Sequence, residues 1–285
     1  MVWLHQFSHA ASKVDVNTIC KSCSLHCRKA VLALLAASLC VVSQAQTWPP
    51  ATPPVPNAPE PQQPVTVRET PLNLVKDQGA IWSSPARIRG NDFHYLIPLG
   101  LMVTLAVTTD HQAMNDVVSK NKSFNDANTK ASNVLVSSFI AAPVVMYAAG
   151  HLADSDHARE TGILSGEALV DSLVVEQGMK LIFLRERPAV DGAKGKFFQT
   201  SVGVDGSFPS NHSMLAWSSA AVLAEEYPSR LNTLAFYGIA TGVSLTRVLG
   251  QQHFPSDVLV GSAFGWMIGH YVYKKHHRWH NEIFR

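Results

Sequence analysis

Apolar residues recur with helical spacing from Asp92 to the end of the chain, and clusters of glycine, proline and polar residues interrupt them. No run alternates apolar and polar residues for long enough to predict a strand. The pattern predicts an all-α fold, a helical bundle of about six core helices. The predicted helices cover residues 95–109, 133–150, 164–185, 213–226, 231–250 and 256–275.

The N-terminal region lacks this pattern. A basic pair, Arg28-Lys29, precedes an apolar run over residues 30–42 and small residues that end at Ala45, which is typical of an export signal. Residues 1–45 are therefore predicted to be an extended signal peptide. Residues 46–64 are rich in proline and predict an extended linker. Residues 65–91 are predicted to be a loosely packed lead-in to a helical domain over residues 92–285.

All four cysteines of the chain precede the predicted cleavage site. Cys20, Cys23 and Cys27 lie close together with His26 and could form a small zinc cluster. An over-long leader is the favoured interpretation, because no folded domain surrounds these residues.

The small fraction of charged residues bears on whether the protein contacts a membrane. Charged residues make up 15% of the chain, below the roughly 25% usual in soluble domains, which indicates an apolar helical domain or contact with a membrane. The formal net charge of +2 is too small to indicate nucleic-acid binding. Residues 133–150 and 231–249 approach the length of about 20 apolar residues that a membrane span needs. The favoured location is periplasmic or on the outer face of the cytoplasmic membrane, and a multi-pass membrane protein is the alternative.

Three groups of polar residues stand beside the predicted helices. Lys180 and Arg187 are seven residues apart, two helical turns, so both should project from one helix face about 10 Å apart along the axis. Pro188 is expected to end that helix. Two cations on one face indicate a bound anion, although such a pair can also be a solvated or lipid-facing basic surface.

The second group is the loop that leads into the fourth predicted helix. A loop at a helix N-terminus presents unpaired backbone N–H groups and the positive end of the helix dipole, which suits an anion. Ser210 can donate its hydroxyl, and Asn211 can adopt the left-handed conformation that opens an anion nest. The alternative is a plain N-cap followed by His212 at the surface.

The third group is Arg247, His253 and Asp257. A carboxylate four residues after an imidazole can accept its N–H, select the tautomer and stabilise the charged ring. The alternative is a purely structural His–Asp cap. The three groups together favour an anion-binding site more strongly than any one group does alone. A purely structural interpretation would require the basic surface, the N-cap and the His–Asp cap all to occur in the same chain.

This series resembles the signature of the type-2 phosphatidic acid phosphatase superfamily, which vanadium haloperoxidases and bacterial acid phosphatases share. The resemblance covers about residues 133–273. Two positions depart from the family pattern: Asn211 replaces a glycine, and Thr246 replaces the serine before the arginine. The matching residues are Lys180, Arg187-Pro188, Pro209, Ser210, His212, Arg247, His253 and Asp257.

The resemblance implies roles for these residues at one end of the bundle, where helix termini meet. His253 would be the nucleophile that forms a phosphohistidine, Asp257 would orient it, and His212 would protonate the leaving alkoxide. The phosphoryl oxygens would be bound by Lys180, Arg187, Ser210, Asn211 and Arg247. The expected activity is metal-independent hydrolysis of a phosphate monoester or lipid (pyro)phosphate, with no cofactor and with vanadate as an inhibitor.

Two rival functions use the same residues. A vanadate-dependent haloperoxidase would bind its metal at His253, and a non-catalytic anion-binding protein resting on the membrane would keep only the pocket. Two other polar clusters are expected to be solvated rather than metal sites. They are the loop with His151, Asp154, Asp156 and His157, and the basic tail with His276, His277 and His280.

Overall fold

The computed structural model describes residues 65–278. The predicted signal peptide, the proline-rich linker, the cysteines and His280 lie outside these residues. Seven α-helices and no strand lie within the described range, so the all-α prediction is confirmed. The helices are α2 (Thr70–Ser83), α3 (Phe93–Gln112), α4 (Lys122–Leu152), α5 (Asp156–Phe183), α6 (Asn211–Glu226), α7 (Arg230–Leu249) and α8 (Pro255–His276).

Helices α4 and α5 begin well before the apolar pattern predicts, at residues 122 and 156 rather than 133 and 164. Both starts carry a side-chain cap: Asn121 accepts a hydrogen bond from the N–H of Phe124, and Ser155 accepts one from Ala158. A capped first turn is stable with polar residues, because its free N–H groups are satisfied locally. Apolar periodicity alone therefore places these helix starts too late.

Helix α2 was not predicted by the sequence analysis. Its inner face is polar: Asp77 is fully buried and bonds the Nε2 of His276 at 2.7 Å. Asn73 Nδ2 donates to Glu167 Oε1 of α5 at 3.1 Å. A helix that packs through polar partners shows little apolar periodicity, so the sequence pattern did not reveal it.

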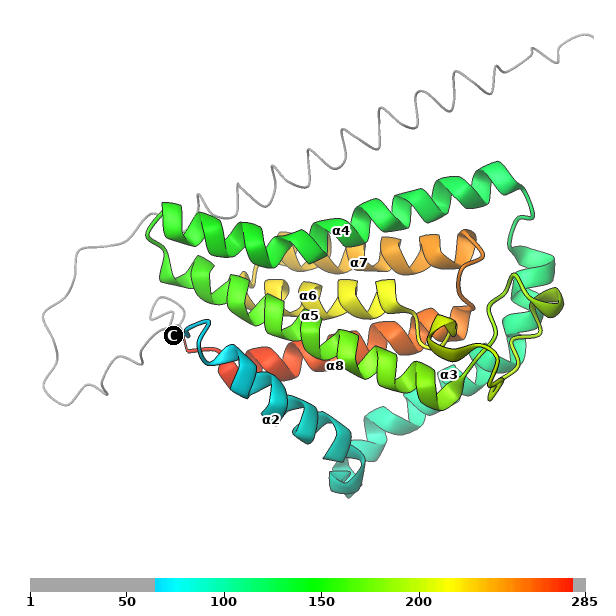
Figure 1. The fold of residues 1–285 in the computed structure, drawn as a ribbon, viewed down its shortest axis with the longest axis horizontal. Coiled ribbons are helices and arrows are strands. Elements are labelled where there is room, and N and C mark those ends of the chain that lie inside the picture. Colours follow the sequence, from blue (N-terminus) through cyan, green and yellow to red (C-terminus); the bar gives the residue numbers. More distant parts are fainter. Residues whose placement is uncertain (1–64, 279–285) are drawn as a thin grey trace, which may run out of the picture.

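Helices α4 to α8 form the bundle, with α6 packed among α4, α5, α7 and α8 (Figure 1). One apolar cluster joins α5, α6 and α8, and contains Leu164, Met214 and Ile268. A second joins α4, α6 and α7, around Phe139 and Val243. Helix α3 packs chiefly against α8 at the edge of the bundle (Figure 1).

Glycines on α8 allow α8 and α6 to approach closely. A Cβ at Gly265 would lie 2.3 Å from the carbonyl oxygen of Met214, and one at Gly269 would lie 2.2 Å from that of Ser218. Small residues four apart let two helix backbones come into contact. This contact aligns the N-terminus of α6 with that of α8, where the N–H of Ser210 donates to the carbonyl of Asp257 at 3.0 Å.

Two helical stretches are long and apolar enough to cross a membrane, Gly90–Val117 and Lys122–Leu152. The apolar window of the first is 0% buried, whereas that of the second is 28% buried. Large apolar side chains of α3 face outward, including Tyr95, Leu101 and Leu105. These surfaces favour association with a membrane. Residues 231–249, which approached span length in sequence, are not one of the two stretches.

Candidate active site

Four helix termini meet at one end of the bundle. They are the end of α5, the start of α6, the end of α7 and the start of α8, beside the loop that joins α5 to α6 (Figure 1). Burial, and then the positive charges of Lys180, Arg187 and Arg247, lower the pKa of both His212 and His253, as expected for side chains that lie close together. The predicted cations and imidazoles are therefore brought together.

The prediction that Lys180 and Arg187 project from one helix face is wrong. Helix α5 ends at Phe183, and Leu184 adopts the left-handed conformation with φ of 43°. The chain then runs extended, and its backbone bonds the α5–α6 loop, with Glu186 N to Lys196 O at 3.0 Å. Arg187 reaches the site from this segment, where its Nε donates to the carbonyl of Asp205 at 2.9 Å.

Helix α6 begins at Asn211, with Ser210 at the N-cap position. The Ser210 side chain makes no capping hydrogen bond, and its hydroxyl accepts one from Ser213 at 3.2 Å. The first N–H groups of a helix have no partner within it, so this end offers donors to an anion. Asn211 has helical rather than left-handed geometry, so the unpaired N–H groups here are those of the helix terminus and not of a left-handed nest.

Asn211 is held by an acid that the sequence analysis did not consider. Its Nδ2 donates to Glu176 Oε2 at 3.1 Å, and Glu176 Oε1 lies 2.7 Å from Lys180 Nζ. Glu176 and Lys180 are both buried. Lys180 thus has a carboxylate partner one turn before it, and Asn211 ties that partner to the start of α6.

His253 is buried, and its Nδ1 lies 2.7 Å from the carbonyl oxygen of Ser207. A carbonyl only accepts, so Nδ1 carries the proton and Nε2 has the free lone pair. Asp257 Oδ2 lies farther away, 3.6 Å from Nδ1. The Ser207 carbonyl therefore selects the tautomer, and Asp257 adds negative charge beside the ring.

Asp257 is itself held by Arg185, a residue that the sequence analysis missed. Arg185 Nη1 lies 2.6 Å from Asp257 Oδ1, and Nη2 lies 2.7 Å from Asp110 Oδ2. The guanidinium lies between the rings of Phe197 and Phe254, 4.5 and 4.1 Å from their centroids. Only Glu186 separates Arg185 from Arg187 in sequence. The spacing from Lys180 to Arg187-Pro188 pointed to Arg187, and no pattern indicated the structural role of Arg185.

Arg247 has no carboxylate partner within residues 65–278. Its side chain is buried, Nη1 donates to Ser132 Oγ at 3.3 Å, and Nε has no hydrogen-bond partner. Burial, together with the charge of Arg187, lowers the pKa of Arg247 to about 10. A buried guanidinium with an unpaired N–H is costly unless an anion joins it.

His212 lies near the same cations, and its Nε2 is 2.9 Å from Asn133 Oδ1. Burial, and then the charges of Arg247 and other cations, lower the pKa of His212 to about 3. Burial also lowers the pKa of His253 well below its ordinary value. Both imidazoles are therefore neutral at pH 7 before an anion enters. An anion would neutralise the cations and favour a proton on His212.

The two clusters expected to be solvated differ from each other. Asp154 and Asp156 pair with Arg159 at the surface, which agrees with a solvated loop. For His157 the expectation is wrong, because this residue lies in the first turn of α5 and is buried against Glu226 of α6. The tail does not agree with a solvated end: His276 is buried against Asp77, and His277 contacts two glutamates. For these two histidines the expectation of a solvated end is wrong, because acids on α2, α5 and α6 reach the end of α8.

Comparison with known proteins agrees with the residues at this site. Residues 161–281 match the model of the PAP2 superfamily. Over 69 residues the chain is 35% identical to a lipid A 1-phosphatase of Porphyromonas gingivalis, and the match covers 24% of this chain and 16% of that protein. The chain thus spans less than a fifth of that relative. No solved structure matches the chain. The family match includes every predicted site residue, from Lys180 to Asp257.

Proposed function

We propose that the chain is a phosphatase that hydrolyses a lipid phosphate or pyrophosphate through a phosphohistidine at His253. The observation that carries the proposal is the buried guanidinium of Arg247, with an N–H that has no partner in the described residues, beside Lys180 and Arg187. Three cations at helix termini suit the oxygens of a phosphoryl group. The PAP2 match and the printed activity of the relative support a phosphatase.

The first step transfers the phosphoryl group to the protein. The lone pair on Nε2 of His253 forms the P–N bond while the bond from phosphorus to the lipid oxygen breaks. The Ser207 carbonyl holds the Nδ1 proton, and the Asp257–Arg185 pair balances the charge that develops on the ring. Lys180, Arg187, Arg247, Ser210 and the first N–H groups of α6 bind the phosphoryl oxygens.

The leaving oxygen needs a proton, which His212 supplies. The substrate's negative charge favours protonation of His212, which is neutral in the empty site, and the proton then passes to the alkoxide. In the second step neutral His212 accepts a proton from water, the water oxygen attacks phosphorus, and the P–N bond breaks. The products are inorganic phosphate and an alcohol, or inorganic phosphate and a lipid monophosphate when the substrate is a pyrophosphate, and His253 returns with its lone pair free. No step requires a metal or a cofactor.

A lipid substrate is supported by the apolar outer surface of α3, with Tyr95, Leu101 and Leu105 exposed. We further propose that the site acts on the periplasmic face of the cytoplasmic membrane. Recovery of the protein entirely in the soluble fraction, with none on membranes sedimented at low ionic strength, would contradict the membrane part of this proposal.

The activity is tested by phosphate release in the presence of a chelator, with a long-chain lipid phosphate and an aryl phosphate side by side. We expect turnover of the lipid substrate, inhibition by vanadate, and a labelled phosphohistidine after rapid quenching that His253→Ala lacks. Full activity in His253→Ala would remove the catalytic assignment. Bromide oxidation with peroxide and vanadate, without phosphate release, would favour a haloperoxidase instead.

A further inference from the structure

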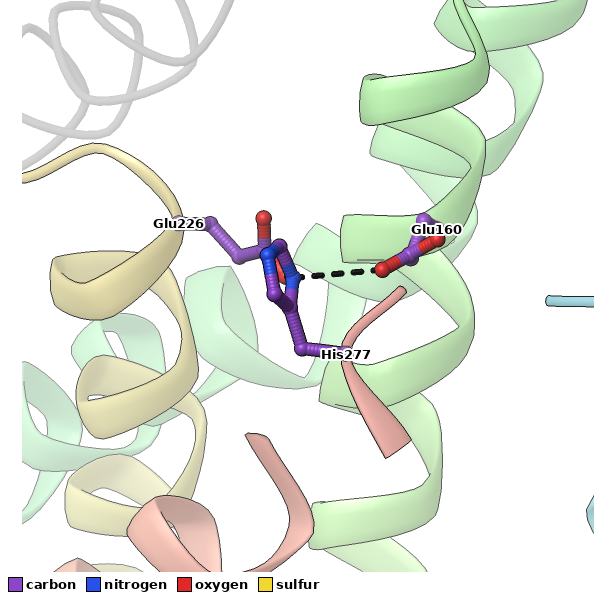
Figure 2. Close-up of side chains that lie close together, drawn as sticks. All are labelled: Glu160, Glu226 and His277. Atoms are coloured by element: carbon purple, nitrogen blue, oxygen red, sulfur yellow. Dashed lines mark hydrogen bonds and ion pairs between the residues drawn. The ribbon is translucent and has the colours of Figure 1, made fainter. Parts of the chain in front are cut away.

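A second cluster of titratable side chains lies at the opposite end of the bundle. Glu160 comes from the second turn of α5, Glu226 is the last residue of α6, and His277 directly follows α8 (Figure 2). Their ligand atoms all lie within 4.8 Å of one another. Lys180 and Glu160 are 20 residues apart on α5, so the cluster is roughly 30 Å from the candidate active site along the helix axis.

The cluster converges on one imidazole nitrogen. His277 Nδ1 lies 3.2 Å from Glu160 Oε1 and 3.0 Å from Glu226 Oε1. Both glutamates are buried, at 1% and 3% exposure. Two buried carboxylates from different helices need a positive charge between them. A single N–H can direct its hydrogen to one acceptor well, whereas a metal ion between the three atoms would bond all of them.

A second histidine contacts the outer oxygen of Glu226. His157 precedes Glu160 by one helical turn, so the two share a face of α5. Its Nε2 lies 2.9 Å from Glu226 Oε2, and its side chain is also buried. One imidazole and two carboxylates, with a fourth position left for water, are a donor set that zinc accepts in tetrahedral sites.

The spacing of the donors suits such an ion. Bonds of about 2.0–2.2 Å to zinc put tetrahedral donor atoms roughly 3.4 Å apart. The contacts of 3.2 and 3.0 Å from His277 Nδ1 to the two carboxylate oxygens need to open by only a few tenths of an ångström. We infer that Glu160, Glu226 and His277 bind one divalent cation of the zinc class, and that His157 orients Glu226 through its second carboxylate oxygen.

The role of this site would be structural. The ligands join α5, α6 and the end of α8, three helices that also carry catalytic groups at their far ends. A cation bound there fastens the C-terminal end of α8 to the bundle without entering the reaction. Metal binding at this end therefore predicts greater stability, whereas phosphatase turnover in chelator needs only the folded bundle.

The test uses the full chain with Cys20, Cys23 and Cys27 changed to serine, because these residues offer a competing zinc site. The protein is stripped with chelator, incubated with Zn²⁺, and its zinc content and Tm are measured. We expect one zinc per chain and a Tm that rises with free Zn²⁺. Replacing Zn²⁺ with Co²⁺ should give the intense visible absorption of tetrahedral cobalt. No retained zinc, or a spectrum of octahedral cobalt, would overturn the inference in favour of a protonated His277 alone.

Matched variants locate the ion. His277→Gln and Glu226→Gln should lose zinc, whereas His157→Gln should weaken binding by about 10–100-fold if it orients Glu226. His276→Gln is the control, because its imidazole bonds Asp77 on α2 at 2.7 Å and does not belong to the cluster. Zinc content that is equal in His277→Gln and His276→Gln would exclude this site, provided that both variants show a cooperative unfolding transition.

Discussion

Arg185 and Arg187 allow a stringent test of how this site is built, because two arginines two residues apart have opposite surroundings. Arg185→Met removes a cation whose side chain is 2% exposed and which bridges Asp110 and Asp257 at 2.7 and 2.6 Å. Breaking a buried ion pair by removing one partner costs about 3–5 kcal/mol, since a buried charge is left unpaired. For a domain of this size that corresponds to a fall in Tm of roughly 6–20 °C.

The fall in Tm caused by Arg185→Met should depend on pH. Burial raises the pKa of Asp257 to about 6 even with Arg185 in place, and removing Arg185 raises it further. A carboxyl whose pKa is higher in the folded than in the unfolded protein destabilises the fold as pH rises between those two values. The Tm deficit of Arg185→Met should therefore shrink when the pH is lowered from about 8 to about 5.

Arg187→Met is the matched control. Arg187 is half-buried, and among residues 65–278 its side chain bonds the carbonyls of Asp205 and Gln252, at 2.9 and 3.3 Å. Its removal leaves no buried carboxylate without a partner, so Tm should stay within about 3 °C of the parent protein. The value of kcat/KM should fall by about 100–1000-fold, as for loss of one group that stabilises a transition-state oxyanion.

The assay is thermal unfolding of the three proteins in one detergent at two pH values, with phosphate release measured on the same samples. The reasoning is refuted if Arg185→Met melts within about 2 °C of the parent protein at the higher pH, or if its deficit does not change with pH. It also fails if Arg187→Met is the less stable of the two.

Three further predictions concern other parts of the site. Asn211→Gly restores the glycine of the family pattern but loses a hydrogen bond to a buried carboxylate. The free energy of unfolding should fall by about 1.5–3 kcal/mol, while kcat/KM stays within about threefold of the parent value. A fall in kcat/KM of more than about 100-fold would show that Asn211 itself binds the phosphoryl group. Gly265→Ala should lower the free energy of unfolding by about 1–3 kcal/mol, because the new methyl group forces α8 away from α6. Gly238→Ala, with open space around it, should raise stability slightly. Equal effects of the two variants in denaturant unfolding would exclude the close-contact explanation. The protein should take up a proton when it binds sulfate at about pH 5, because the bound anion raises the low pKa of His212. Calorimetry in two buffers of different ionisation enthalpy measures this uptake, which His212→Asn should abolish.

The helical class and the order of the long helices were predictable from sequence, because apolar residues on a helix face must repeat with its period. Helix α2 was not, since Asp77 and Asn73 face the bundle through polar partners from α5 and α8. The end of α5 was predicted two residues late, at residue 185. The left-handed turn at Leu184 has no strong signal in a leucine, and the hydrogen bonds that stabilise the next segment come from residues 196–199.

Sequence alone determined which residues gather at the candidate site, because the spacings from Lys180 to Arg187, from Ser210 to His212, and from Arg247 to Asp257 carry a recognisable chemistry. Only the tertiary structure decided how they are held. Arg185 neutralises Asp257, Ser207 selects the tautomer of His253, and Glu176 pairs with Lys180. The contacts of Arg185 and Ser207 join segments far apart in the chain or depend on backbone atoms. Such contacts leave no local pattern, because burial and approach distance are set by the packing of the whole bundle.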